Sequence, residues 1–297
     1  ITDEFKIEKG VRQGDCLSPI LFTAVLEEVF KELEWEGKGI RINGEYISHL
    51  RFADDIVLFA NNGEDLASRL QQLNMVGKKV GLRINLTKTK VMYNSFSEQV
   101  PITLQEMPVE VCSEYVYLGQ LVATGENSRL KEVNRRVKLG WSAFGRNAHI
   151  LKSKMPMALK RKVFNQCILP VLTYGSETWV LNSAITQRLQ TTQRGMERCM
   201  LGITRRDRKR NTWVRQRTGV MDIIAKIRSL KWMWAGHVAR RNDNRWTSAV
   251  LNWTPRYVKR PRRRPKDRWN RDIVKYLGVT WQREAQNREN WKALGEA

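Results

Sequence analysis

The sequence predicts an α+β domain in about its first 120 residues and an all-α region after it. Strand-type and helix-type spacings of apolar residues alternate up to about residue 122, whereas helical spacing dominates from residue 126 onward. The charge changes at the same place. Residues 1–120 hold 13 basic and 18 acidic side chains, a net of −5, and residues 121–297 hold 40 and 12, a net of +28. This distribution predicts that the mildly acidic front part carries out chemistry and that the strongly basic back part binds the partner.

The bulk composition describes a globular chain with a polyanionic partner. An apolar fraction of 41% and 11 tryptophans are typical of folded proteins, and 297 residues suffice for two cores. A net charge of +23 favours nucleic acid or an acidic membrane surface as the partner. No apolar run approaches the ~20 residues of a membrane span, and no signal peptide is visible. Four scattered cysteines without a CxxC pair do not fit a structural zinc site.

Turn residues delimit the elements of the front part. Ser18 and Pro19 fit the N-cap and the first position of a helix. The pair Asn43-Gly44 tolerates the positive φ angles of a type I′ hairpin turn, and Gly81 follows a second helix. The expected elements are a strand over 5–9, a helix over 18–33, hairpins over 40–48 and 50–60, a helix over 66–80, and strands over 82–84, 91–93 and 116–121.

Helices follow one another in the back part. They are expected over residues 130–148, 158–169, 185–201 and 221–234. Pro170, Gly202 and Gly236 mark the expected ends of the last three, because proline and glycine disfavour continued helix. The charge blocks 205–210 and 259–266 contain turn residues and are expected to be loops or a linker.

Asp54 and Asp55 occupy the expected turn of the second hairpin, between the apolar stretches 50–53 and 56–60. Adjacent carboxylates repel each other. A turn nevertheless lets both approach one ion, although successive strand side chains point to opposite faces. Hard divalent cations such as Mg²⁺ bind carboxylate oxygens together with substrate phosphates. Because Asp is also common in plain polar turns, the hairpin by itself leaves a metal site and a solvated turn equally open.

Three further segments carry residues suited to nucleotide contact. Arg12 can meet a phosphate, Gln13 can hydrogen-bond, and Gly14 lets a ligand approach the backbone. Any one of these segments is compatible with an ordinary loop or strand edge. Their combination, in this order and at this spacing, is not explained by ordinary loops and strand edges. The three segments are the loop Arg12-Gln13-Gly14, residues 81–90 with Lys88 and Lys90, and Tyr117-Leu118-Gly119.

Together with the Asp54-Asp55 turn, these segments resemble the palm of reverse transcriptases from non-LTR, LINE-like retrotransposons, over about residues 1–120. The later segments 169–179 and 234–240 are similar to the C-terminal part of endonuclease–reverse-transcriptase polyproteins from animal elements. The site residues that the resemblance implies are Arg12, Gln13 and Gly14 for template and nucleotide, Asp54 and Asp55 for metal, Lys88 or alternatively Lys90 for protonating the leaving pyrophosphate, and Tyr117, Leu118 and Gly119 for the primer grip.

The resemblance also implies an architecture and partners. A polymerase palm, an antiparallel sheet with packed helices, is expected over residues 1–122, a helical thumb-like segment over 123–202, and a basic helical and linker region over 203–297. The implied reaction is RNA-directed DNA synthesis by two-metal nucleotidyl transfer, with an RNA template, a DNA primer, dNTP and Mg²⁺, or Mn²⁺ as the alternative. The protein is expected to work in the nucleus after cytoplasmic synthesis, without a membrane, and the sequence sets no oligomeric state.

The family's third metal-binding aspartate is expected on a strand before residue 1, with the fingers subdomain before that. Asp3 and Asp15 are the nearby acids, and neither stands in a matching context. Because the chain also begins at Ile1 without a methionine, we expect a fragment that is inactive alone. Two other interpretations stay open: a non-catalytic nucleic-acid-binding remnant of a decayed element and, ranked lower, a metal nuclease.

The basic side chains of the back part are expected to bind phosphates along a duplex. Residues 205–217 and 256–271 combine arginines with Trp213, Tyr257 and Trp269, a mix suited to phosphate contact and base stacking. These tryptophans also fit a core, and residues 259–266 also fit a nuclear localisation signal. The helix cations expected on the surface are Arg135, Arg136, Lys138, Lys152, Lys154, Lys160, Arg161 and Lys162.

Overall fold

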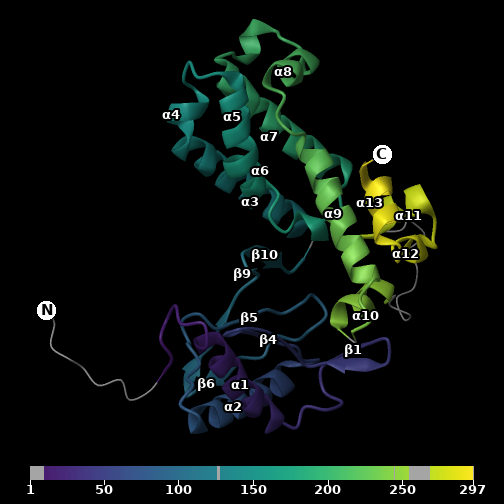
Figure 1. Ribbon diagram of the computed structural model, residues 1–297. Helices are drawn as coiled ribbons and strands as arrows, with labels where there is room; N and C mark the ends of the chain where they lie inside the picture. The colour runs from purple at the N-terminus through teal and green to yellow at the C-terminus, as the bar shows by residue number, and fades with distance from the viewer. Residues whose placement is uncertain (1–9, 126–127, 244, 254–267, 297) are drawn as a thin grey trace, which may run out of the picture. The chain divides into compact units, whose positions relative to one another are not determined.

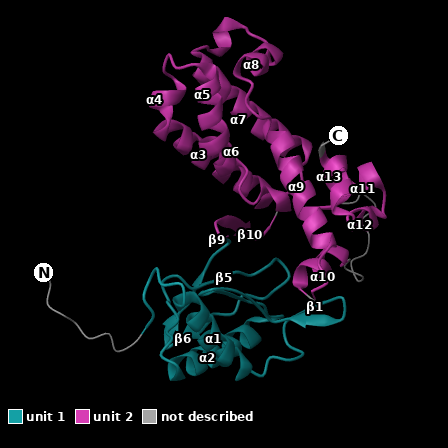
Figure 2. Ribbon diagram, in the orientation of Figure 1, with its two compact units in different colours: residues 1–115 teal, residues 116–297 magenta. Residues whose placement is uncertain are grey.

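The computed structural model describes residues 10–125, 128–243, 245–253 and 268–296, and it divides into two compact units, residues 1–115 and 116–297 (Figures 1 and 2). The first unit mixes two long helices with short strands, and the second is helical after its first hairpin as far as it is described. The α+β class is therefore confirmed. The strand expected over 5–9, the charge block 259–266, Asp3 and Tyr257 lie outside the described residues.

The first unit pairs its strands two by two. Its elements are α1 (Ser18–Lys31), β1 (Ile40–Ile42), β2 (Glu45–Ile47), β3 (His49–Phe52), β4 (Asp55–Leu58), α2 (Gly63–Lys79), β5 (Lys90–Val91), β6 (Thr103–Leu104), β7 (Met107–Pro108) and β8 (Glu110–Val111). Strands β5 and β8 pair in parallel, and the other pairs are antiparallel hairpins. Asn43 and Gly44 have φ angles of 52° and 103°, so the type I′ turn is confirmed.

The core of the first unit lies between α1, α2 and the β3–β4 hairpin. Leu26, Val29 and Phe30 share one face of α1 and are buried, because helical spacing brings them together. Leu73 of α2 joins this cluster, and Leu58 of β4 packs against it. The hairpin that carries the two aspartates is therefore backed by two helices.

Two expected details of the first unit are wrong. Ser18 is the first residue of α1 rather than its N-cap, because its hydroxyl donates to the Arg12 carbonyl oxygen at 2.6 Å. Residues 82–84 form no strand. The Leu82 N–H instead donates to the Gly77 carbonyl oxygen at 2.9 Å and closes the end of α2.

The boundary between the units falls inside β9, the first strand of a hairpin, and the second unit continues in helices. Its elements are β9 (Glu114–Tyr117), β10 (Gln120–Ala123), α3 (Ser128–Arg146), α4 (Ala148–Leu151), α5 (Met157–Val163), the π-helix η1 (Phe164–Ile168), α6 (Leu169–Leu172), the 3₁₀-helices η2 (Ser176–Thr178) and η3 (Arg205–Asp207), α7 (Ser183–Leu201), α8 (Asn211–Thr218), α9 (Ile223–Ala239), α10 (Trp246–Asn252), α11 (Arg271–Leu277), α12 (Trp281–Glu284) and α13 (Arg288–Glu296). The single strand expected over 116–121 is thus a hairpin. Gly202, at a φ of 69°, ends α7 as expected.

The core of the second unit joins α3, α6, α7 and α9. Phe144, Leu172, Leu189 and Ile227 contribute to it from these four helices, and each is at most 2% exposed. None of the helices in the described parts of the chain is long and apolar enough to cross a membrane.

Pro170 and Gly236 do not end helices as expected. The chain passes from α5 through the π-helix into α6, and the Leu169 N–H donates to the Phe164 carbonyl oxygen five residues back. This wider turn accommodates Pro170, which lacks an N–H group and would clash in a regular α-helix. Gly236 lies inside α9, where a Cβ atom would stand 2.4 Å from the Trp291 indole nitrogen. Close packing, rather than a helix stop, explains this glycine.

A tryptophan-rich cluster closes the second unit around α9. Trp232 and Trp291 stack with centroids 4.2 Å apart, and each indole N–H donates to the other residue's carbonyl oxygen, at 2.8 and 3.0 Å. The Trp269 N–H donates to the Glu177 carbonyl oxygen at 2.6 Å, and the Lys231 ammonium lies over its ring. Of the two roles that the sequence left open for Trp269, core packing and base stacking, these contacts support packing.

Candidate catalytic site

Two exposed carboxylates stand at the tip of the β3–β4 hairpin. Phe52 pairs with Asp55, so Ala53 and Asp54 form a two-residue turn. Ala53 has a φ of 51°, a left-handed conformation that is uncommon for residues other than glycine and is often found at functional sites. Asp55 is the first residue of β4, and both acids are exposed to solvent. The tip thus presents two adjacent carboxylates with no packing to restrict them.

Helix α1 holds this hairpin from behind. The Arg51 guanidinium pairs with the Glu27 carboxylate at 2.9 Å and lies over the Phe30 ring at 4.4 Å. Strand residues that pair directly share a face, and neighbours along a strand alternate. Asp55 therefore shares a face with Phe52, which is 64% exposed, and this face is opposite the one that Arg51 turns to α1. One face of the hairpin is fixed, and the face of Asp55 is open.

His49 belongs to the packed face. Its ring lies 4.4 Å from that of Phe30 and 5.8 Å from that of Trp35, measured between centroids. Burial of the imidazole lowers its pKa from 6.5 to about 4, and the charge of Arg51 adds to the shift. His49 is consequently neutral near pH 7 and supports the hairpin by packing.

The loop ahead of α1 is exposed and ordered by its own hydrogen bonds. The Arg12 carbonyl oxygen accepts from the Ser18 hydroxyl at 2.6 Å and from the Asp15 N–H at 3.3 Å. Gly14 has a φ of 90°, a conformation that requires glycine. The Asp15 carboxylate accepts the backbone N–H two residues further on at 2.8 Å, so it serves as a local cap. The Arg12 and Gln13 side chains are exposed.

Lys88 and Lys90 differ in their partners. The Lys90 ammonium forms an ion pair with the Glu110 carboxylate across the β5–β8 ladder. Lys88 is exposed, and its side chain forms no ion pair with any residue that the structure describes. Its backbone N–H donates to the Asn85 side chain at 3.1 Å, which orders the turn. Of the two lysines, Lys88 has the available ammonium group.

The fit of a metal ion to this region is partial. Asp54 and Asp55 offer the oxygen ligands that hard divalent cations prefer. Across the described residues, no three His, Cys, Asp or Glu side chains gather as a metal site. The hydrogen bonds that order the Arg12 loop join residues 12–18 to one another, and those that order the Lys88 turn join residues 85–89. The chemistry of the two carboxylates fits a cation, and the described ligand set is small.

The hairpin turn of the second unit, Leu118-Gly119, is clamped by its carbonyl oxygens. These two residues have φ angles of 46° and 73°, and Tyr117 ends the strand before them. The Tyr174 hydroxyl donates to the Leu118 carbonyl oxygen at 2.9 Å. The Arg136 guanidinium donates to the Gly119 carbonyl oxygen and lies over the Tyr174 ring at 4.4 Å.

Glu132 connects this clamp to β10. It is 3% exposed, accepts the Leu121 N–H at 2.9 Å, and pairs with Arg136 at 2.6 Å and Arg135 at 3.2 Å. Neither Glu132 nor Tyr174 was predicted from the sequence as a site residue. The Glu-to-Arg spacing of four residues in a helix was the available signal for Glu132, whereas nothing local indicated the Tyr174 contact.

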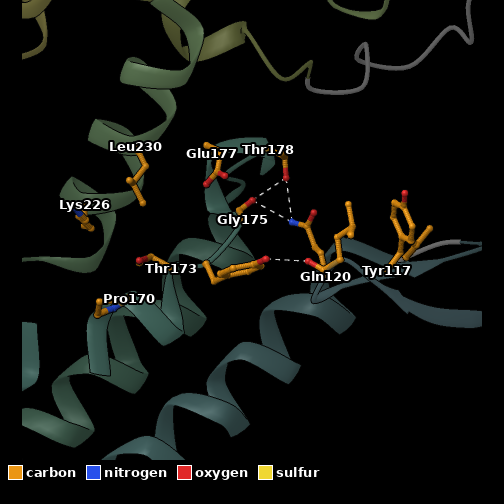
Figure 3. A pocket seen from close by; sticks show the side chains of 12 residues that line it. Tyr117, Gln120, Pro170, Thr173, Gly175, Glu177, Thr178, Lys226 and Leu230 are labelled. Atoms are coloured by element: carbon orange, nitrogen blue, oxygen red, sulfur yellow. Dashed lines mark hydrogen bonds between the residues drawn. The ribbon is translucent and has the colours of Figure 1, made fainter. Parts of the chain in front are cut away.

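A mostly apolar cavity of about 680 Å³ lies beside the clamped turn (Figure 3). The Gln120 amide reaches across one side of it and donates to the Gly175 carbonyl oxygen and the Thr178 hydroxyl, both at 3.1 Å. Lys226 and Leu230 of α9 line the opposite side. The side chains of β10, η2 and α9 thus enclose one space within the second unit.

Three of the helix cations expected on the surface are structural. Arg136 and Lys160 are each only 5% exposed, so the expectation is wrong for them. The Lys160 ammonium donates to the Met200 carbonyl oxygen, and the Arg161 guanidinium to the Thr218 carbonyl oxygen, both at 2.9 Å. They satisfy the last carbonyl groups of α7 and α8. The expected cations that are exposed are Lys138, Lys152, Lys154 and Lys162.

Comparison with known proteins agrees with this arrangement of segments. The family described as "Reverse transcriptase (RNA-dependent DNA polymerase)" matches residues 2–122. A transposon-derived protein of Caenorhabditis elegans is 33% identical over 273 residues, which cover 86% of this chain and 97% of the worm protein. The chain is therefore a member of the reverse transcriptase family.

Relatives from mobile elements define the branch. The Pol polyprotein of the retrotransposable element R2 of Nasonia vitripennis is 41% identical over 76 residues, and that of R2DM of Drosophila melanogaster is 37% identical over 87 residues. The chain belongs to the reverse transcriptases of non-LTR retrotransposons. These matches cover only 7% and 8% of the two polyproteins, so the chain spans a small part of their length.

Proposed function

We propose that this chain carries part of the catalytic centre of an RNA-directed DNA polymerase, with its palm in residues 1–122. The observation that carries the proposal is the exposed Asp54-Asp55 pair on a hairpin that α1 holds by the Arg51–Glu27 ion pair. Residues 123–202 act as a thumb-like segment for the template–primer duplex, and residues 203–297 as a further basic region. The expected place of action is the nucleus.

The proposed reaction joins a dNTP to a DNA primer paired with an RNA template. The primer 3′-hydroxyl gives up its proton to water, its oxygen forms a bond to the α-phosphorus, the α–β phosphoanhydride bond breaks, and pyrophosphate leaves. Asp54 and Asp55 hold Mg²⁺ or Mn²⁺, which when bound supplies charge stabilisation for this displacement. Lys88 donates a proton to the leaving pyrophosphate, because its ammonium is not engaged as that of Lys90 is.

The remaining proposed contacts position the substrates. Arg12 and Gln13 meet template and nucleotide, and Gly14 lets them approach the backbone. The turn at Tyr117, Leu118 and Gly119 grips the primer end. The Tyr174 hydroxyl donates to the Leu118 carbonyl oxygen at 2.9 Å and the Arg136 guanidinium donates to that of Gly119, and these bonds keep the turn in one shape.

Primer extension tests the proposal. The chain is joined to the upstream half of a reverse transcriptase of this family and is supplied with RNA template, DNA primer, dNTP and Mg²⁺. We expect extension that falls at least about a thousandfold with Asp54→Asn or Asp55→Asn, since the carboxylates act at the reacting phosphate. Glu106→Gln, at the tip of the β6–β7 hairpin, is the matched control and keeps activity. Undiminished extension by both Asn variants would remove these residues from the site.

A non-catalytic nucleic-acid-binding remnant is the second candidate. It is favoured by the small ligand set, since no three metal-binding side chains gather across the described residues. This candidate predicts binding of an RNA–DNA hybrid but no extension, even with the upstream half supplied. The same assay therefore separates the two functions.

A further inference from the structure

The turn between α7 and α8, together with α8 itself, concentrates positive charge. Residues 204–217 contain seven arginine and lysine side chains and one acid, Asp207, and all seven cations are exposed. Arg215 pairs with the Asp222 carboxylate at 3.2 Å, whereas the other six form no ion pair with any residue that the structure describes. We name these six residues the α7–α8 basic patch: Arg205, Arg206, Arg208, Lys209, Arg210 and Arg217.

The turn that carries the patch is held in one conformation. The Asp207 carboxylate accepts from the Thr204 N–H at 2.6 Å and from its hydroxyl at 2.9 Å. The Thr204 backbone hydrogen bond lowers the pKa of Asp207, so this acid stays ionised and fixes the turn. Arg208 follows with a φ of 52°, a conformation that costs energy in any residue with a Cβ atom. Local hydrogen bonds thus keep a strained turn that directs arginines into solvent.

Helix α8 is anchored beneath the patch by hydrogen bonds to residues of α7. The Arg198 guanidinium donates to the Asn211 side chain at 2.7 Å and to the Lys209 carbonyl oxygen at 3.3 Å. Glu197 is fully buried, pairs with Arg194, and accepts from the Thr218 hydroxyl at 3.3 Å. The patch therefore rests on a fixed support, and binding would cost little ordering of the backbone.

Trp213 stabilises the cations instead of offering a free ring. The Lys209 ammonium and the Arg217 guanidinium both lie over its ring, 5.5 and 5.6 Å from the centroid. A base that stacked on Trp213 would have to compete with these two groups for the ring. The partner of the patch is therefore recognised by charge.

We propose that the α7–α8 basic patch binds the phosphodiester backbone of a nucleic acid strand without sequence preference, outside the proposed palm and thumb-like segments. The six cations of the patch repel one another, because none of them forms an ion pair with a described residue, and a polyanion relieves this repulsion while releasing its own counterions. Contacts to backbone phosphates position the protein on the strand but do not read its sequence. The inference rests on the proposed function only in taking nucleic acid as the partner, and it does not depend on Asp54 or Asp55.

Salt-dependent binding tests the patch in the full chain. Fluorescence anisotropy follows binding to single-stranded DNA, single-stranded RNA and duplex DNA of about 30 nucleotides. The patch variant combines Arg205→Gln, Arg206→Gln and Arg210→Gln. The matched control, with the same loss of charge from exposed sites, combines three substitutions on α11, α12 and α13: Lys275→Gln, Arg283→Gln and Arg288→Gln.

The patch variant is expected to lower the slope of log affinity against log salt by about 2–3, since each phosphate contact contributes about 0.7–0.9. Its affinity at low salt is expected to fall at least about tenfold, while the control stays within about threefold of the wild type. Comparison of the DNA and RNA probes then shows which strand type the patch prefers. Asp54→Asn with Asp55→Asn leaves this binding unchanged, so the two proposals fail separately.

Three results would overturn the proposal. The first is a patch variant with the same affinity and slope as the control variant. The second is a loss of about tenfold or more with Trp213→Leu but none with the patch variant, which would indicate base stacking. The third is a patch variant that weakens binding to phosphatidylserine vesicles and not to any nucleic acid probe, which would indicate an acidic membrane surface.

Discussion

Protonation of His49 should loosen the hairpin that carries the two aspartates. The imidazole packs against both Phe30 and Trp35, and its burial lowers its pKa from 6.5 to about 4. The unfolded chain therefore takes up a proton at a higher pH than the folded chain does. The stability contributed by neutral His49 is fully present above about pH 6.5 and is lost as the pH falls toward 4.

The size of the effect follows from the two pKa values. Each unit of difference corresponds to about 1.4 kcal/mol, so the shift from 6.5 to about 4 contributes at most about 3 kcal/mol. Between pH 7 and pH 5 the free energy of unfolding of the first unit should fall by about 2 kcal/mol from this residue alone.

Urea unfolding at both pH values measures this loss. His49→Gln should remove about 2 kcal/mol of the pH dependence, because glutamine does not titrate. His149→Gln is the matched control, since His149 is exposed, and it should retain the full pH dependence. Equal losses of stability in wild type and His49→Gln between pH 7 and pH 5, or an NMR titration midpoint of the His49 ring near 6.5, would contradict a stabilising role for the neutral imidazole.

Three substitutions in the second unit test its packing by urea unfolding. Glu132→Ala leaves Arg136 buried without its carboxylate and should cost about 3–5 kcal/mol; a loss under about 1 kcal/mol would mean that the pair is not buried in solution. Tyr174→Phe removes one hydrogen bond but keeps the ring, so it should cost about 1 kcal/mol, and no loss would contradict the bond to the Leu118 turn. Gly236→Ala places a methyl group against the Trp291 indole and should cost about 1–3 kcal/mol. Its control is Gly145→Ala, which has open space around it and should be neutral or stabilising by up to about 1 kcal/mol. Equal effects of the two substitutions would contradict the close approach of Gly236 to Trp291.

Local turn chemistry explains what the sequence predicted correctly. Asn43, Gly44 and Gly202 have the positive φ angles that asparagine and glycine tolerate, and these angles are set mainly by the residue type itself. The β3–β4 hairpin was likewise predictable, because apolar strand residues flank a short polar turn on both sides. Helix content in the second unit follows from the spacing of apolar residues.

Contacts between distant residues explain the errors. Pro170 continues a helix only because a π-helical turn precedes it, and Gly236 is required by a tryptophan 55 residues later in the chain. Lys160 looked like a surface cation, yet its partner is a carbonyl oxygen of Met200. Helical spacing places lysine and arginine side chains on the solvent side, and it does not show which helix ends from elsewhere in the chain pack against them.

In the candidate site, too, local features could be predicted from the sequence and contacts between distant residues could not. The acids at the hairpin tip could be chosen from sequence, because their residue type and flanking strands are local features. The ion pair between Arg51 and Glu27 could not, since it joins a strand to a helix across 24 residues. The clamp on the Leu118 turn joins residues 56 apart, and no periodicity indicates such a contact.

Paramagnetic NMR mapping of Mn²⁺ on the full chain tests whether Asp54 and Asp55 bind a metal ion. A metal site at this hairpin tip predicts selective broadening of the amide signals of Asp54 and Asp55, with a dissociation constant on the order of 1 mM for two exposed carboxylates. The broadening should vanish with Asp54→Asn and Asp55→Asn together and persist with Glu106→Gln, whose acid stands at a similar hairpin tip. Broadening that centres elsewhere, or that survives the double substitution, would contradict a metal-binding role for this hairpin.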